Sequence, residues 1–167
     1  SPVGVSAFLT FYHGGMGRCA TTPRLGETET GAVAQPPFDD YGVNTEGEFI
    51  TELLGGKGSF RTPPRPFDDQ FGALAKLVAR KSHNVRRLSH EDVHLPGYDP
   101  GPGRVAIRVL GPVPERVIGG NSGLRVLGSE SVTRNGHSVV LRVDYDKIRI
   151  LLTGDLNTAS QRLLLSY

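Results

Sequence analysis

The clearest alternation of apolar and polar positions lies in the last third of the chain. Every second residue is apolar across 138–145, and the same alternation recurs across 147–153. A period of two is typical of β-strands, and the short polar step between the two segments is typical of a hairpin turn. If Asp146 is the centre of a three-residue loop, antiparallel pairing places His137 beside Asp155. The hairpin therefore predicts a candidate metal-binding or proton-transfer pair.

The residues after the second strand predict a sharp turn and then a helix. Gly154 allows the backbone to turn, which leaves Asp155 at the carboxyl end of a strand that we expect to be buried. Functional carboxylates are common at that place in layered α/β structures. A helix is predicted from Asn157 through Leu165. The alternative interpretation is that Asp155 or Asn157 only caps this helix.

Weaker patterns along the rest of the chain complete the fold prediction. The best helix is 67–81, which is acidic in its first turn and basic in its last. Its predicted apolar stripe consists of Phe71, Leu74, Leu77 and Val78. Segment 14–45 has no apolar period and is predicted to be a long surface loop. We expect a buried strand at 3–12, a short helix at 46–54, strands at 84–89 and 104–110, and a short strand or helical turn at 124–127. This order predicts an α/β or α+β domain, with helices packed outside a mostly antiparallel or mixed sheet.

The hairpin and its polar ends resemble the middle of the metallo-β-lactamase superfamily. The similarity runs from Gly136-His137-Ser138 through both strands to Leu152-Thr153-Gly154-Asp155, and it is specific over 135–165. It is closest to the branch that resembles the hydrolase domain of DNA-uptake competence proteins, where the position of His137 is often Asn. In this family the His of the first turn and the Asp of the second are both metal ligands.

The resemblance implies a fold, a cofactor and an activity. The implied fold is a layered αββα sandwich, and the implied cofactor is zinc, with two ions in the whole protein. Asp155 would bridge the two ions and His137 would bind one of them. The implied activity is hydrolysis of an ester, a phosphodiester or an amide by a metal-activated water. The implied substrate is a small molecule or a phosphodiester.

The sequence also departs from the family in one important respect. The family signature HxHxDH, which supplies most of the metal ligands, is absent, since the five histidines are His13, His83, His90, His94 and His137. We therefore expect 1–167 to be one partial metallo-β-lactamase-like domain from the interior of a longer protein. Flanking segments or another chain would complete the fold, and zinc would bind weakly or not at all without them. The alternative is a non-catalytic binding or regulatory module that lacks a full metal site.

A second zinc motif, H-E-x-x-H, occurs at His90-Glu91-Asp92-Val93-His94. On an α-helix this spacing places two histidines on one face, with the Glu as general base of a zinc protease. Pro96 follows almost at once and disfavours a helix through the motif. A zinc protease is therefore a minor alternative.

Composition limits the classes of binding partner and the cellular location that we expect. The chain is 37% hydrophobic, with 22 Gly and 12 Pro, and its net charge of +2 gives no reason to expect nucleic-acid or membrane binding. Cys19 is the only cysteine, which excludes an intrachain disulfide and a multi-cysteine metal site. No apolar run approaches the length of a membrane span, and we expect a cytoplasmic protein.

Overall fold

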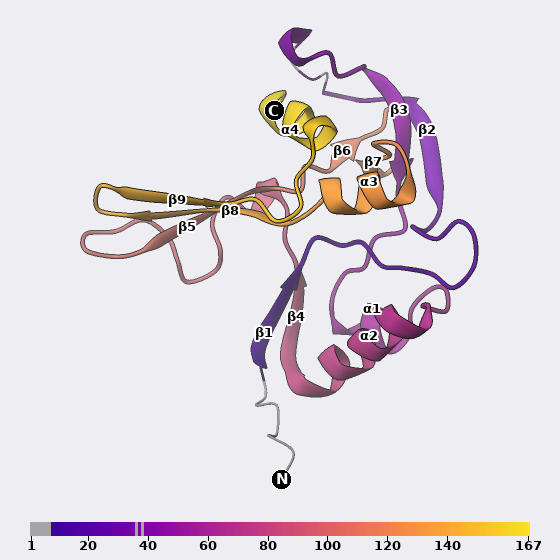
Figure 1. Ribbon diagram of the computed structural model, residues 1–167, viewed down its shortest axis with the longest axis horizontal. Helices are drawn as coiled ribbons and strands as arrows, with labels where there is room; N and C mark the ends of the chain where they lie inside the picture. The colour runs from indigo at the N-terminus through magenta and orange to yellow at the C-terminus, as the bar shows by residue number, and fades with distance from the viewer. Residues whose placement is uncertain (1–7, 36, 38) are drawn as a thin grey trace.

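A computed structural model of the chain describes residues 8–35, 37 and 39–167. It combines helices with three small sheets, two of them antiparallel, and therefore belongs to the α+β class (Figure 1). The strand predicted at 3–12 is found from Phe8 onward, while 3–7 lie outside the described residues. Within the described part of the chain, no helix has the length and apolar character needed to cross a bilayer.

The first unit is a parallel strand pair covered by two helices. In β1 (Phe8–His13) and β4 (Ser82–Arg87), Phe11 pairs with Val85. Helices α1 (Lys57–Arg61) and α2 (Asp69–Lys81) lie against this pair (Figure 1). The core between them is made of buried apolar residues: Leu54, Phe60, Ala75, Val78, Ala79 and Val85.

Helix α2 confirms the best helix prediction, but its buried face is rotated from the predicted stripe. Asp68 caps the helix by accepting from the Phe71 N–H at 2.9 Å. Ala75, Val78 and Ala79 are the buried residues of α2, whereas Leu74 is 43% exposed. The buried face therefore consists of two alanines and a valine, and the largest apolar residues of the helix do not define it.

The second sheet corrects two predictions. Its order is β2 (Thr28–Ala32), β3 (Glu46–Ile50), β7 (Ser122–Arg125) and β6 (Glu115–Arg116), all antiparallel. The helix predicted at 46–54 is wrong, because β3 is paired on both edges, and Phe49 and Ile50 are fully buried. Strand β2 and the short 3-10 helix η1 (Asp39–Tyr41) lie within the predicted loop 14–45, which is therefore partly ordered as secondary structure.

The third sheet projects from the rest of the molecule and is called the arm here (Figure 1). It consists of β5 (Ala106–Gly111), β8 (Val140–Tyr145) and β9 (Ile148–Leu152), in that order and antiparallel. The backbone of 93–98 bonds to the other edge of β5, beginning near the 3-10 helix η2 (His90–Asp92). Strand β9 is therefore the edge of the arm.

The hairpin register differs from the predicted one by a single residue. Tyr145 pairs with Ile148, so the turn has two residues, Asp146 and Lys147, instead of three. Asp146 has a φ of 51°, which makes the tighter turn possible. Continued to the base of the hairpin, this register places Ser138, not His137, opposite Asp155.

Two short helices precede and follow the β8–β9 hairpin in the sequence. Helix α3 (Glu130–Gly136) precedes β8 and was not predicted, while α4 (Thr158–Leu165) confirms the helix predicted after Asp155. Helix α3 begins at Ser129, whose hydroxyl accepts from the Val132 N–H.

Candidate functional site

The two turns that carry the resemblance lie side by side at the base of the β8–β9 hairpin. The Asp155 N–H donates to Ser138 Oγ at 3.2 Å. Gly154 has a φ of 57°, and a Cβ built on it would lie 2.8 Å from the Ser138 Cβ. The Gly-His-Ser and Thr-Gly-Asp segments are therefore neighbours in space, although they are separated by the whole hairpin in sequence.

His137 occupies the C-cap of α3 and is 4% exposed. Its Nε2 donates to the Arg125 carbonyl oxygen at 2.7 Å. Burial lowers the pKa of His137, so the ring is neutral and Nδ1 keeps its lone pair. A histidine that donates one ring N–H to a carbonyl and keeps the other nitrogen free has the tautomer that metal-binding histidines use.

Asp155 lies on the surface and is not the cap of α4. The N-cap is Asn157, whose side chain accepts from the Ser160 N–H at 3.2 Å, while Ser160 Oγ accepts from the Asn157 N–H. Of the two capping assignments considered for this helix, the one to Asn157 is confirmed. Asp155 uses its backbone to hold the hairpin base and leaves its carboxylate exposed.

His137 and Asp155 supply two potential ligands. Within 8–35, 37 and 39–167, no group of three or more His, Cys, Asp or Glu side chains is placed to hold a metal ion. Zinc sites use three or four protein ligands. The two residues fit the donor types that zinc uses, and they would need further ligands to hold it tightly.

The H-E-x-x-H segment does not form the helix that a zinc protease requires. His90 to Asp92 make one short 3-10 helix, and Val93 leaves helical geometry with a φ of 56°. His94 instead pairs with Arg108 of β5. The two histidines are therefore not one turn apart on an α-helix.

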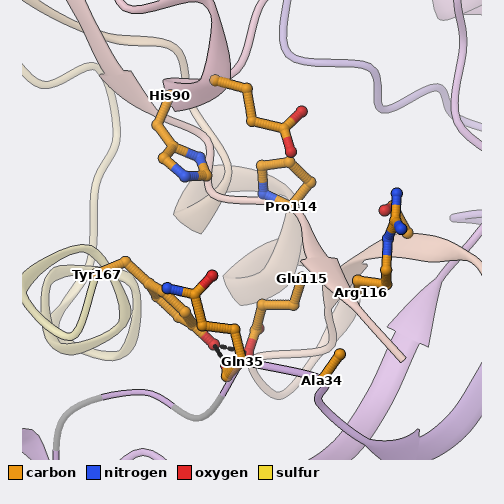
Figure 2. A pocket seen from close by; sticks show the side chains of 9 residues that line it. Ala34, Gln35, His90, Pro114, Glu115, Arg116 and Tyr167 are labelled. Carbon is orange, nitrogen blue, oxygen red and sulfur yellow. Dashed lines mark hydrogen bonds between the residues drawn. The ribbon is translucent and has the colours of Figure 1, made fainter. Parts of the chain in front are cut away.

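A polar cavity of about 280 Å³ lies between η2, β6 and the last residue of the chain. Figure 2 shows His90 on one side of it, Arg116 on another, and Tyr167 reaching toward Glu115. Its other lining residues are Ala34, Gln35, Glu91, Pro114 and Ser122. The volume is at the lower end of ligand pockets, which are usually more apolar.

Glu115, which lines this cavity, belongs to a buried ion pair. Glu115 Oε2 accepts from Arg125 Nε at 2.8 Å, and Glu115 Oε1 accepts from Arg125 Nη2 at 2.6 Å. Tyr167 Oη lies 2.9 Å from Glu115 Oε1 and 3.1 Å from the Gln35 carbonyl oxygen. The Arg125 carbonyl also holds His137, so a chain of polar contacts joins the cavity to the hairpin base.

The sequence gives little sign of this network. Glu115 and Arg125 are separated by loops and a turn, and neither belongs to a recognisable motif. The one sign of a buried ion pair in the sequence is a charged residue between apolar neighbours, since Arg125 lies between Leu124 and Val126. A charged residue in such a strand requires a partner, but the strand alone does not identify it.

The arm has one face made entirely of apolar side chains, called here the apolar arm face. Cross-strand pairs such as Val143 with Ile150 and Tyr145 with Ile148 place these side chains together. Its members are Ile107, Val109, Leu141, Val143, Tyr145, Ile148, Ile150 and Leu152. Near the tip and on β9 the side chains are about half exposed, with Ile148 at 59%. The prediction that 147–153 is a buried strand is therefore wrong for the chain in this structure.

No protein-family model, curated protein or solved structure matches this chain.

Proposed function

We propose that this chain is part of a zinc hydrolase of the metallo-β-lactamase fold, with His137 and Asp155 as two of its metal ligands. The observation that carries the proposal is the contact between the Gly-His-Ser and Thr-Gly-Asp turns, made by Ser138 Oγ and the Asp155 N–H. The tautomer of His137 supports the same role. The proposal also includes the arrangement of the α+β elements as a layered αββα sandwich. It places the protein in the cytoplasm.

Each residue has a defined part in this proposal. A zinc ion held there would supply a water of lowered pKa for attack on an ester, phosphodiester or amide. His137 presents Nδ1 in a fixed orientation, because its Nε2 is held by Arg125. Asp155 presents an exposed carboxylate from a backbone fixed by Ser138. The remaining ligands come from additional polypeptide, either a flanking segment or another chain.

A non-catalytic module is the second candidate, and the burial of His137 favours it. A ring that is 4% exposed and bonded to the Arg125 carbonyl oxygen also works as a structural link between α3 and β7. In that case the hairpin retains the shape of the family without its chemistry. The partner-binding surface of such a module would be the apolar arm face.

Zinc binding separates the two candidates. Alone, the 167-residue chain is expected to bind zinc weakly and to hydrolyse nothing, because two ligands are too few. If the gene encodes residues before Ser1 and these hold the His-rich signature, a longer form that carries them should bind zinc tightly. Metal content measured by mass spectrometry after dialysis reports the outcome.

The decisive variant is Asp155→Asn, made in the longer form, with Asp146→Asn as its matched control. Both side chains are exposed and both changes remove one carboxylate, but Asp146 lies at the far end of the hairpin. The Asp155 variant should lose zinc and hydrolytic activity, whereas the Asp146 variant should keep both. Equal zinc content in the two variants, or a longer form that binds no metal, would support the non-catalytic module instead.

A further inference from the structure

A second cavity, called here the Arg125 cavity, has a volume of about 300 Å³. Its walls come from 42–47, from 125–127 at the end of β7, and from α4. Arg125 and Arg162 line it from two different elements, so two basic residues border one space. The rest of the lining includes several apolar residues, which are Val43, Val126, Leu127, Ala159 and Leu163. The cavity therefore suits a ligand that has both a charged and an apolar part.

Arg125 has N–H donors that its ion pair does not use. The residue is 7% exposed, and a guanidinium carries five N–H donors. Within the described residues, three of them are bonded, two to Glu115 and one to the Glu46 carbonyl oxygen. One donor therefore remains on each of Nη1 and Nη2, the pair of nitrogens that can hold both oxygens of one carboxylate. Since buried donors are normally paired, these two favour a ligand with oxygen acceptors.

The Arg125 side chain is held in one place before any ligand binds. Its two bonds to Glu115 fix one edge of the guanidinium, and its central carbon lies 4.8 Å from the centre of the Phe49 ring. Gly47 leaves room beside the group, because a Cβ built at this position would collide with Nη1. A ligand that binds to a group already fixed loses less conformational entropy in the complex.

We propose that the Arg125 cavity binds a small monocarboxylate with an apolar body. The carboxylate accepts from Arg125. Arg162 adds a second positive charge, since it is exposed and makes no ion pair within 8–35, 37 and 39–167. Glu46 also lines the cavity, and its exposed carboxylate disfavours a second negative group on the ligand. At the roughly 30 Å³ that a water takes, the volume admits about ten non-hydrogen atoms.

Titration of the metal-free 167-residue chain, followed by amide NMR shifts, tests the proposal. The probe is phenylacetate, which combines a carboxylate with an apolar ring and has about the size that the cavity admits. It should bind with a dissociation constant of roughly 0.1 to 1 mM and shift the amides of Gly47, Arg125 and Leu163. Phenylacetamide has the same shape without the charge, and acetate lacks the ring. Each should bind at least about tenfold more weakly.

Two exposed residues separate recognition of charge from an effect on folding. Arg162→Gln should weaken phenylacetate binding by about two- to fivefold, and Glu46→Gln should strengthen it by a similar factor, because both charges are exposed. Arg80→Gln is the matched control, since Arg80 is exposed in the last turn of a helix, as Arg162 is, and does not line the cavity. This variant should bind phenylacetate like the unchanged chain.

Saturable shifts around the cavity, with the Arg162 and Glu46 variants changed in opposite directions, support the proposal. Absence of a saturable shift with phenylacetate overturns it and indicates that water alone fills the cavity. Equal affinity for phenylacetate and phenylacetamide, or equal effects of the Arg162 and Arg80 variants, also overturns it, because the arginines then do not select the ligand. The zinc proposal is tested separately, since this titration contains no metal.

Discussion

At the scale of residues, Glu115 and Arg125 form a buried, doubly hydrogen-bonded ion pair. The Glu115 side chain has no exposed surface, and both of its oxygens accept from Arg125. Arg125 also lies over the Phe49 ring at 4.8 Å and donates to the Glu46 carbonyl oxygen. Removing one partner would leave the other charge buried and unpaired, which costs several kcal/mol.

Tyr167→Phe tests how much the last side chain contributes to this network. Burial and the hydrogen bond to Glu115 raise the pKa of Tyr167, so the phenol stays protonated and can donate to the carboxylate. Its loss should lower the free energy of unfolding by about 1–2 kcal/mol. Urea denaturation measures the change. Tyr145→Phe, at an exposed position on the arm, is the control and should change stability little; equal effects would contradict the assigned role.

The burial of two histidines should make the free energy of unfolding depend on pH. Burial lowers the pKa of both His13 and His137 below 6.5. Below that value the unfolded chain binds protons that the folded chain does not, so the free energy of unfolding falls as pH falls toward the folded pKa values. Above it both states are neutral at these sites, and this contribution is fully present.

Urea denaturation at several pH values between about 7.5 and 5 measures this dependence. In His137→Gln the loss of stability on acidification should be smaller, because the contribution of His137 is removed. His83→Gln, at an exposed position, should leave the slope unchanged. A slope that is the same in all three proteins would show that burial does not separate the folded and unfolded pKa values of His137.

At the scale of elements, the turn between β8 and β9 fixes which residues face each other. Asp146 adopts a positive φ, which most side chains avoid and which Asp tolerates better than β-branched residues. Asp146→Ile should therefore cost about 1–2 kcal/mol of stability. Lys147→Ile is the matched control, because Lys147 is not among the residues with positive φ. Thermal unfolding of the two variants checks the difference, and equal melting temperatures would contradict the turn geometry.

The sequence predicted elements with strong local signals and failed where tertiary pairing decided the outcome. Alternation located β8 and β9, and the charge pattern located α2, because these signals belong to the segments themselves. The helix predicted at 46–54 rested on the helical spacing of its apolar residues, which are Phe49, Ile50, Leu53 and Leu54. Pairing with β2 and β7 makes 46–50 a strand instead. The hairpin register failed by one residue, since loop length depends on the conformation of Asp146, which composition does not specify.

At the scale of the whole molecule, the body and the arm differ in how much apolar surface they bury. The units around α2 and β3 contain the buried apolar clusters, whereas all five residues of β9 are exposed. Opening of the arm should therefore require less free energy than opening of the body. This difference is a property of the arrangement and was not visible in the sequence, where 147–153 has the pattern of a buried strand.

Hydrogen exchange at a low protein concentration checks this expectation. Amides of β9 should exchange faster than amides of β3, which is paired on both edges and carries the fully buried Phe49 and Ile50. Protection of β9 equal to that of β3 in dilute solution would contradict the difference between arm and body.

The candidate site shows the same limit of sequence reasoning. The resemblance predicted His137 and Asp155 as metal ligands from two short sequence motifs. The turns that carry these residues do meet at the hairpin base. The sequence did not indicate that the ring of His137 is held by Arg125, or that Arg125 is paired with Glu115. Those contacts join residues from separate strands, and their side chains carry no shared pattern.

The close approach of Gly154 to Ser138 has a consequence for mutational scanning. Any side chain at 154 meets both a positive φ and the Ser138 Cβ, so substitutions there will lower the amount of folded protein whatever the chemistry nearby. A scan scored only by activity would mark Gly154 as if it were catalytic. Scoring abundance in parallel separates the two causes: variants at Gly154 should lose abundance, whereas variants at Asp155 should keep it.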